Sequence, residues 1–143
     1  MSNSINERKA ALAQRLKHFE NKDERLKFII EQGKKLTPMD AKFKLDQFMI
    51  KGCISRAWIF PQQDDSGRVT FKADSEAMIV KGIIALLLEI YNDNTPEDIL
   101  QEDGSFLADV GITQHLSTNR RNGLTNVIKM IHFYAAAFAK QKP

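Results

Sequence analysis

Residues Ser75–Tyr91 read SEAMIVKGIIALLLEIY, and this stretch decides the fold. Apolar side chains occupy nearly all sides of a helix with this sequence, so other elements must cover it on more than one face. The apolar run from Ile83 to Leu88 ends at Glu89, well short of the length that crosses a membrane. The stretch therefore predicts a buried core helix in a soluble protein.

The segment before this helix has the pattern of a strand with one solvent-exposed face. Residues 69–74 alternate apolar with polar side chains, and the turn-forming residues 64–67 precede them. Residues 54–60 read as the strand on the other side of that turn, and residues 45–50 read as a third strand. We expect a small antiparallel three-stranded sheet packed by the core helix, with Cys53 at the bend between the strands at residues 45–50 and 54–60.

Helix-start and helix-stop signals divide the rest of the chain. Residues 4–7 have the spacing of a capping box, and Thr95 precedes a proline at the first helical position. Gly33 is a natural C-terminal stop for a second helix, and the residues around Pro38 favour a surface loop. The expected helices span residues 8–19, 22–33, 96–101 and 105–110, and a long final helix begins at Ser117 or Asn119. Together with the sheet, these helices predict the α+β class.

Length and composition bound the class of protein. The 143 residues, 43% of them hydrophobic, fit one domain spanning residues 1–143 with a substantial core. The net charge of +3 comes from positive charges interspersed with eighteen acidic residues, which does not indicate nucleic-acid binding. The single cysteine excludes an internal disulfide and a structural metal site built from several thiolates. Because the N-terminus lacks a signal-peptide core, we expect a cytoplasmic protein.

Cys53 is the only sulfhydryl of the chain and the first candidate for chemistry. A lone cysteine is most often a small buried hydrophobe, but Gly52 clears space beside this one, and the flanking Lys51 and Arg56 favour the reactive thiolate. One thiolate is enough to take the outer sulfur of a partner's persulfide, by the displacement that also drives thiol–disulfide exchange. Building an iron–sulfur cluster or closing a dithiol redox cycle requires more cysteines than the chain has.

Other polar residues are weaker candidates. Arg120 and Arg121 lie in the first turn of the final helix, where the helix dipole disfavours cations by up to about 1 kcal/mol, and such exceptions are enriched at functional sites. Asp74 stands at the strand-to-helix junction and reads by default as an N-cap. His115 is more often a helix-entry or core histidine than a base. The other histidines, His18 and His132, have no partner at metal-ligand spacing.

Three segments, in order and at fitting separations, resemble the SufE family of sulfur-acceptor proteins. They are GCISRAW at residues 52–58, DSEAMIVKG at residues 74–82 and TQHLSTNRRNGL at residues 113–124, within a similarity that spans about residues 20–135. The resemblance implies a fold like the IscU-type scaffold, a small antiparallel sheet packed by helices. It also implies a role in iron–sulfur cluster assembly.

The same resemblance implies a role for individual residues. Cys53 would accept sulfane sulfur as a persulfide from a pyridoxal-phosphate cysteine desulfurase, SufS-like or CsdA-like, stimulate that enzyme, and pass the sulfur to a cluster scaffold. Asp74 and Arg120 would belong to the desulfurase-facing surface and support the loop that carries the cysteine, with Gly52 beside the thiol and His115 as an organiser of the site. The pyridoxal phosphate belongs to the partner, so the chain itself needs no cofactor.

Two other classes of protein remain as alternatives. A stand-alone transferase or hydrolase using Cys53 and His115 would turn over a small substrate without a partner. A basic helical nucleic-acid binder would show strongly salt-dependent affinity, and the mixed charges disfavour it.

Phe48 and Arg56 stand where the SufE family commonly has an asparagine and a glutamine. The sequence leaves the oligomeric state open between a monomer and a homodimer.

Overall fold

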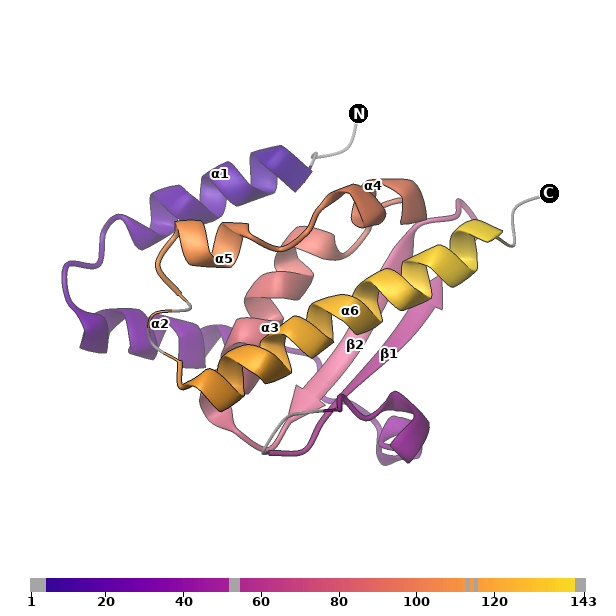
Figure 1. Cartoon of the computed structure of the whole chain (residues 1–143), viewed down its shortest axis with the longest axis horizontal. Coiled ribbons are helices and arrows are strands. Elements are labelled where there is room, and N and C mark those ends of the chain that lie inside the picture. The colour runs from indigo at the N-terminus through magenta and orange to yellow at the C-terminus, as the bar shows by residue number, and fades with distance from the viewer. Residues whose placement is uncertain (1–4, 52–54, 113, 115, 141–143) are drawn as a thin grey trace.

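The computed structural model describes residues 5–51, 55–112, 114 and 116–140, and it is an α+β fold (Figure 1). A two-stranded antiparallel sheet and the helices around it enclose one apolar core, in which α3 is the central helix. In order, the elements are α1 (Ile5–Leu16), α2 (Lys22–Lys34), η1 (Ala41–Phe43), η2 (Asp46–Phe48), β1 (Ala57–Gln63), β2 (Val69–Ser75), α3 (Met78–Tyr91), α4 (Pro96–Gln101), α5 (Phe106–Asp109) and α6 (Thr118–Lys140).

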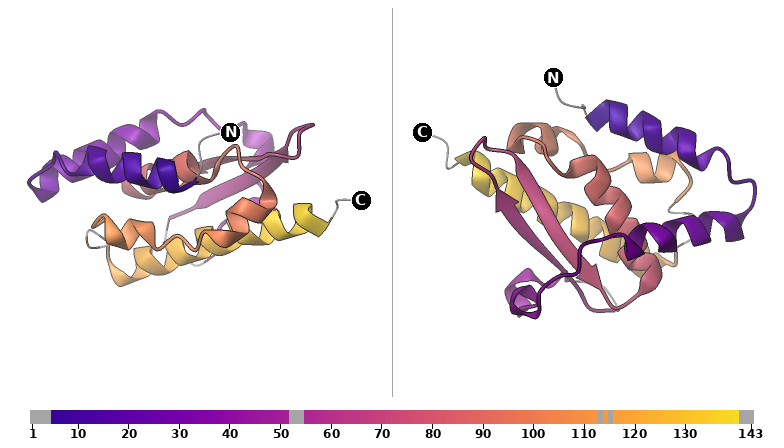
Figure 2. Two further views of the ribbon diagram at one scale, coloured as in Figure 1. Left: turned by 90° about the horizontal axis from the view of Figure 1, so that it is seen from above. Right: turned by 180° about the vertical axis from the view of Figure 1, so that it is seen from behind.

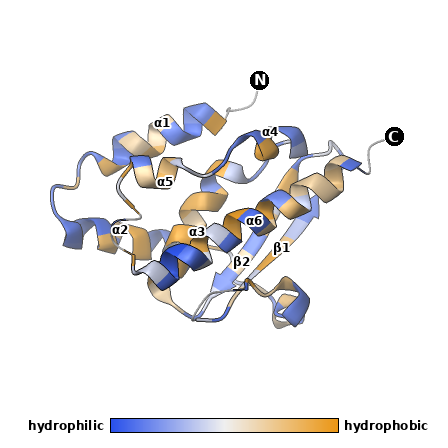
Figure 3. Cartoon of the chain, in the orientation of Figure 1, coloured by the Kyte–Doolittle hydropathy of each residue, from blue (hydrophilic) through white to orange (hydrophobic). Residues whose placement is uncertain are grey.

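Helix α3 is the predicted core helix, and it is covered from several directions. It contacts α1, α2, α6 and β2. In the view from above, α1 and α2 lie in one layer of the molecule and α6 lies in another (Figure 2). Apolar residues continue round α3, as its colouring shows (Figure 3). Its buried residues are Gly82, Ile83, Ile84, Leu86, Leu87, Leu88, Ile90 and Tyr91.

The sheet has two strands, so the prediction of three was wrong. β1 pairs with β2 in a register that sets Trp58 opposite Asp74, and the expected strand at residues 45–50 contributes only an isolated bridge from Met49 to Trp58. Residues 46–48 form the short helix η2 instead. The aromatic side chain of this turn packs on β1: the Phe48 ring meets the Phe60 ring edge-on at 4.8 Å between centroids. The turn thus contributes side-chain packing in place of a full ladder of backbone hydrogen bonds.

Helices α2 and α3 cross with their backbones in close contact. A Cβ atom added to Gly82 would lie 2.0 Å from the carbonyl oxygen of Ile29, and one added to Gly33 would lie 2.8 Å from the backbone nitrogen of Gly82. Gly33 was predicted as a C-terminal stop, but α2 continues to Lys34 and Gly33 is buried against α3. Its small size serves the helix crossing.

The remaining helix signals agree with the structure near their expected positions. Thr95 caps α4, because its Oγ1 accepts a hydrogen bond from the backbone N–H of Asp98 at 3.2 Å. Ser117 accepts one from the backbone N–H of Arg120 at 3.3 Å, at the start of α6. Within the described residues, no helix combines the length and the apolar character needed to cross a membrane.

The substitution Gly82→Ala tests whether close helix packing or helix propensity has the larger effect on stability at this position. Propensity alone predicts that Gly82→Ala stabilises the protein by up to about 1 kcal/mol. Because the new methyl group would overlap the Ile29 carbonyl, we expect instead a loss of about 1–3 kcal/mol in the free energy of unfolding, measured by urea denaturation. A gain in stability would show that the two helices can separate at little cost.

Candidate functional site

Three of the predicted site residues, Gly52, Cys53 and His115, lie outside the described residues. The chain is described up to Lys51 on one side of the cysteine and from Ser55 on the other. The described residues nearest to the cysteine in the chain are these two flanks, and the side chains that contact them form the candidate site.

The two flanks meet at the start of β1. The backbone N–H of Ile50 donates to the carbonyl oxygen of Ala57 at 2.8 Å, and Met49 forms a bridge with Trp58. Ile50 and Ala57 are both buried. Ile50 and Ala57 are thus core residues on either side of the stretch 51–56. We call this stretch the Cys53 segment.

Asp74, near the end of β2, binds two lysines from distant parts of the chain. Its Oδ2 lies 2.8 Å from Lys44 Nζ, and its Oδ1 lies 3.2 Å from Lys81 Nζ. Oδ1 also accepts a hydrogen bond from the backbone N–H of Ser75 at 2.8 Å. The prediction that Asp74 is the N-cap was wrong, because α3 begins later and its N-cap is Ala77. Asp74 instead ties residue 44 and α3 to the end of β2.

These contacts determine the protonation of Asp74. Partial burial by itself would raise the pKa of the carboxyl, but the hydrogen bonds from Lys44, from the Ser75 backbone and from Lys81 together outweigh it, so the pKa lies below its ordinary value. Asp74 is therefore a carboxylate at neutral pH. A carboxylate held by two cations is suited to structural and electrostatic roles and not to proton transfer near neutrality.

Trp58 faces Asp74 across the two strands and carries an unusual buried donor. Its side chain is 5% exposed, and its Nε1 has no hydrogen-bond partner within the described part of the chain. Lys44 Nζ lies 5.3 Å and Arg56 Cζ 5.6 Å from the centroid of its ring, which places two cations against the indole. A buried N–H is usually paired, because leaving one unpaired costs about 1–3 kcal/mol.

The C-terminal flank of the Cys53 segment is held by Glu76. Arg56 donates to Glu76 Oε2 from Nη2 at 2.6 Å and from Nε at 3.0 Å. The carbonyl oxygen of Arg56 accepts hydrogen bonds from the backbone N–H of Glu76 at 3.0 Å and from Ser75 Oγ at 3.3 Å. Arg56 is thus fixed to the junction between β2 and α3 by both its side chain and its backbone.

Sequence reasoning missed three of these residues. Lys81 and Glu76 both lie in the quoted segment 74–82, but only the fold shows that they turn toward Asp74 and Arg56. Lys44 carried no signal in the sequence, because its partner, Asp74, lies thirty positions further along the chain.

Arg120 lies where it was predicted, in the exposed first turn of α6. Its backbone N–H donates to Ser117 Oγ at 3.3 Å. Among the described residues, no ion pair joins Arg120 to Asp74, whose carboxylate is held by Lys44 and Lys81.

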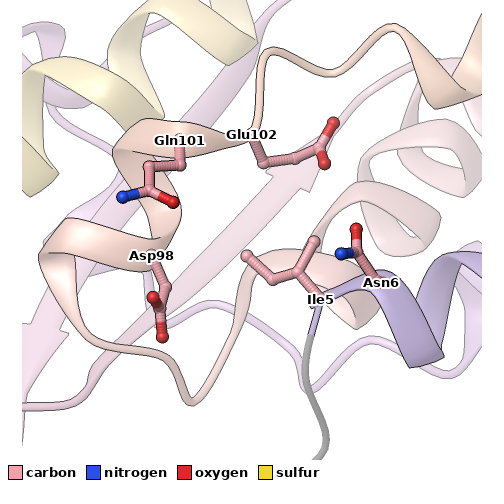
Figure 4. A pocket seen from close by; sticks show the side chains of 5 residues that line it. All are labelled: Ile5, Asn6, Asp98, Gln101 and Glu102. Atoms are coloured by element: carbon pink, nitrogen blue, oxygen red, sulfur yellow. The ribbon is translucent and has the colours of Figure 1, made fainter.

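A separate hollow of about 230 Å³ lies between the start of α1 and α4, and Figure 4 shows the side chains that line it, including those of Asp98 and Glu102. Glu102 is 7% exposed, and its carboxylate binds Lys9 Nζ at 2.6 Å and the backbone N–H of Gly104 at 3.0 Å. In Figure 1, α4 and the N-terminal end of α1 lie near the top of the view, whereas β1 begins near the bottom. Glu102 thus has a structural role in joining α1 to the loop after α4.

The contribution of Asp74 to stability depends on pH. We expect Asp74→Asn to lower the free energy of unfolding by about 1–3 kcal/mol at pH 7, because two lysines lose their carboxylate partner. A lowered folded-state pKa stabilises the fold above the unfolded value, near 3.8, and this stabilisation is lost as the pH falls through the folded value. The difference between the two proteins should therefore shrink below about pH 4.

Urea denaturation at several pH values measures this difference. Asp65→Asn, at an exposed position in the turn between the strands, is the matched control and should change stability little at any pH. An Asp74→Asn protein as stable as the wild type at pH 7 would contradict a structural role for the two ion pairs.

Comparison with known proteins agrees with this architecture. The solution structure of a hypothetical protein from Thermus thermophilus superposes with a TM-score of 0.78 at 18% identity, covering 94% of this chain and 97% of that one. The similarity shows that the two chains share a fold. The family model of the SufE Fe-S metabolism associated domain matches residues 10–135. The chain therefore belongs to the SufE family, which is associated with iron–sulfur metabolism.

Proposed function

We propose that this protein accepts persulfide sulfur on Cys53 from a pyridoxal-phosphate cysteine desulfurase, SufS-like or CsdA-like, stimulates that enzyme, and passes the sulfur to an iron–sulfur cluster scaffold. The observation that carries the proposal is that the family match, residues 10–135, includes the only thiol of the chain. The residues on both sides of that thiol are anchored to the core, which suits a group that must be presented to another protein.

The transfer is a displacement at sulfur. The Cys53 thiolate attacks the outer sulfur of the persulfide on the desulfurase, the sulfur–sulfur bond of that persulfide breaks, and the desulfurase cysteine leaves as a thiolate with the electron pair. The product is a persulfide on Cys53. A thiolate of the acceptor repeats the displacement at the scaffold and returns Cys53 to its reduced form. No oxidant is consumed, and the pyridoxal phosphate acts only in the partner enzyme.

The charges near the Cys53 segment support this chemistry. Lys51 is exposed at its N-terminal end, and a nearby cation favours the thiolate over the thiol. Arg56, at the other end, shares its charge with Glu76 at 2.6 Å. Arg120 is exposed on α6, and with Asp74 it is our candidate for the surface that meets the desulfurase. Because the reaction starts from a reduced thiol, we place it in the cytoplasm.

Mass spectrometry of the intact protein tests the proposal. After incubation with a cysteine desulfurase and cysteine, without added reductant, we expect the wild-type chain to gain one sulfur atom, and the gain to disappear on treatment with a thiol reductant. Cys53→Ser should gain none, because the chain has no other cysteine. The wild-type chain should also raise the rate at which the desulfurase consumes cysteine, and Cys53→Ser should not.

Two results would contradict the proposal. One is a wild-type chain that gains no sulfur from either type of desulfurase. The other is turnover of thioester or ester substrates by this chain alone, abolished in Cys53→Ser, which would favour a stand-alone transferase or hydrolase.

A further inference from the structure

The N-terminal flank of the Cys53 segment is tied to a different element from the C-terminal flank. Asn126, in the third turn of α6, donates from Nδ2 to the carbonyl oxygen of Lys51 at 2.7 Å. The two residues are 75 positions apart in the chain. This hydrogen bond is short for an N–H donor, and it fixes the residue two positions before Cys53.

The Lys51 carbonyl has no place in the sheet. The last backbone pairing before the segment is the hydrogen bond from Ile50 to Ala57, so Lys51 is the first residue to leave it. The partly exposed Asn126 side chain supplies a donor to this carbonyl. α6 thereby holds the segment on one side, while Glu76 at the junction of β2 and α3 holds Arg56 on the other.

We infer that Asn126 is a positioning residue for sulfur transfer: its hydrogen bond to Lys51 sets the direction in which the chain leaves the core toward Cys53. The inference rests on the proposed function, because it concerns the thiol that accepts the sulfur. It adds a contribution of α6 to the reaction at a site distinct from Arg120. Asn126 does not touch the reacting atoms, so it acts on the rate only through the backbone that it holds.

Loss of the hydrogen bond has two separable effects. A hydrogen bond of this kind contributes about 0.5–1.5 kcal/mol, so without it the backbone amides of residues 50–57 should exchange with deuterium about two- to tenfold faster. A thiol held less well in its reactive orientation should accept sulfur more slowly at saturating carrier concentration, by about threefold or more. The carrier concentration that gives half the maximal rate should change less than about twofold, because the docking surfaces are intact.

Two variants and a control make the test specific. Asn126→Ala removes the side chain, and Asn126→Asp keeps its shape but offers no N–H donor to Lys51. Asn122→Ala makes the same change one turn earlier on the exposed surface of α6, so it reproduces the gain in helix propensity and leaves the Asn126 donor to Lys51 in place. Hydrogen exchange is measured on each protein alone, and sulfur transfer is measured with a cysteine desulfurase and cysteine.

We expect both Asn126 variants to show faster exchange at residues 50–57 and slower transfer, and Asn122→Ala to match the wild type in both. Unchanged exchange in the Asn126 variants would show that the hydrogen bond to Lys51 does not hold the segment. Faster exchange with an unchanged transfer rate would overturn the positioning role. A wild-type chain that takes no sulfur would instead refute the proposed function, while the exchange data would still decide whether Asn126 holds the segment.

Discussion

The structure depends on the burial of α3, a helix with apolar residues on nearly every side. Burying each large aliphatic side chain stabilises the fold by about 1.5–3 kcal/mol, and six of the eight buried positions of α3 carry such a side chain. To cover this helix, α2 approaches until its backbone touches that of α3 at Gly82, and α6 and β2 close the remaining sides. α2, α6 and β2 are therefore positioned so that they exclude water from α3.

That burial also determines where the polar residues lie. β2 runs directly into α3 through residues 74–77, so fixing α3 fixes Asp74 and Glu76 at the end of the sheet. Each of these carboxylates holds a cation from elsewhere in the chain, Lys44 and Arg56 respectively. The Cys53 segment is therefore attached to rigid elements at both ends, the arrangement that best keeps a reactive group in a defined orientation.

Local patterns in the sequence predicted the parts of the fold that local forces determine. The core helix, the strand pair around the turn at residues 64–67 and the cap at Thr95 were all readable from neighbouring residues. The prediction of a strand at residues 45–50 was wrong. The Phe48 ring instead packs onto Phe60 from the short helix η2, and no local sequence pattern encodes that contact.

The same distinction holds at the candidate site. Asp74 was recognised as a residue of interest, but the N-cap role predicted for it was wrong. Its carboxylate instead binds Lys44 and Lys81, which lies in the first turn of α3. The hydrogen bond from Asn126 to Lys51 joins residues 75 positions apart and has no signature in the sequence. Contacts between distant segments are settled by how the helices pack, so a single sequence identifies the residue types and leaves their partners open.

The ion pairs that hold Asp74 and Glu76 contain more positive than negative charge. Lys44, Lys81 and Arg56 carry three positive charges against the two negative charges of Asp74 and Glu76, which leaves one positive charge, and Lys51 adds another. These ion pairs hold Lys44, β2 and α3 together, and in the proposed function the excess positive charge would act on the thiol and on an approaching protein. An excess of positive charge favours the thiolate, and it also attracts a partner with an acidic surface over a distance of about 8 Å at physiological salt. In the proposed function, one set of residues would serve both the nucleophile and the encounter with the sulfur donor, because its negative members already form ion pairs within the fold.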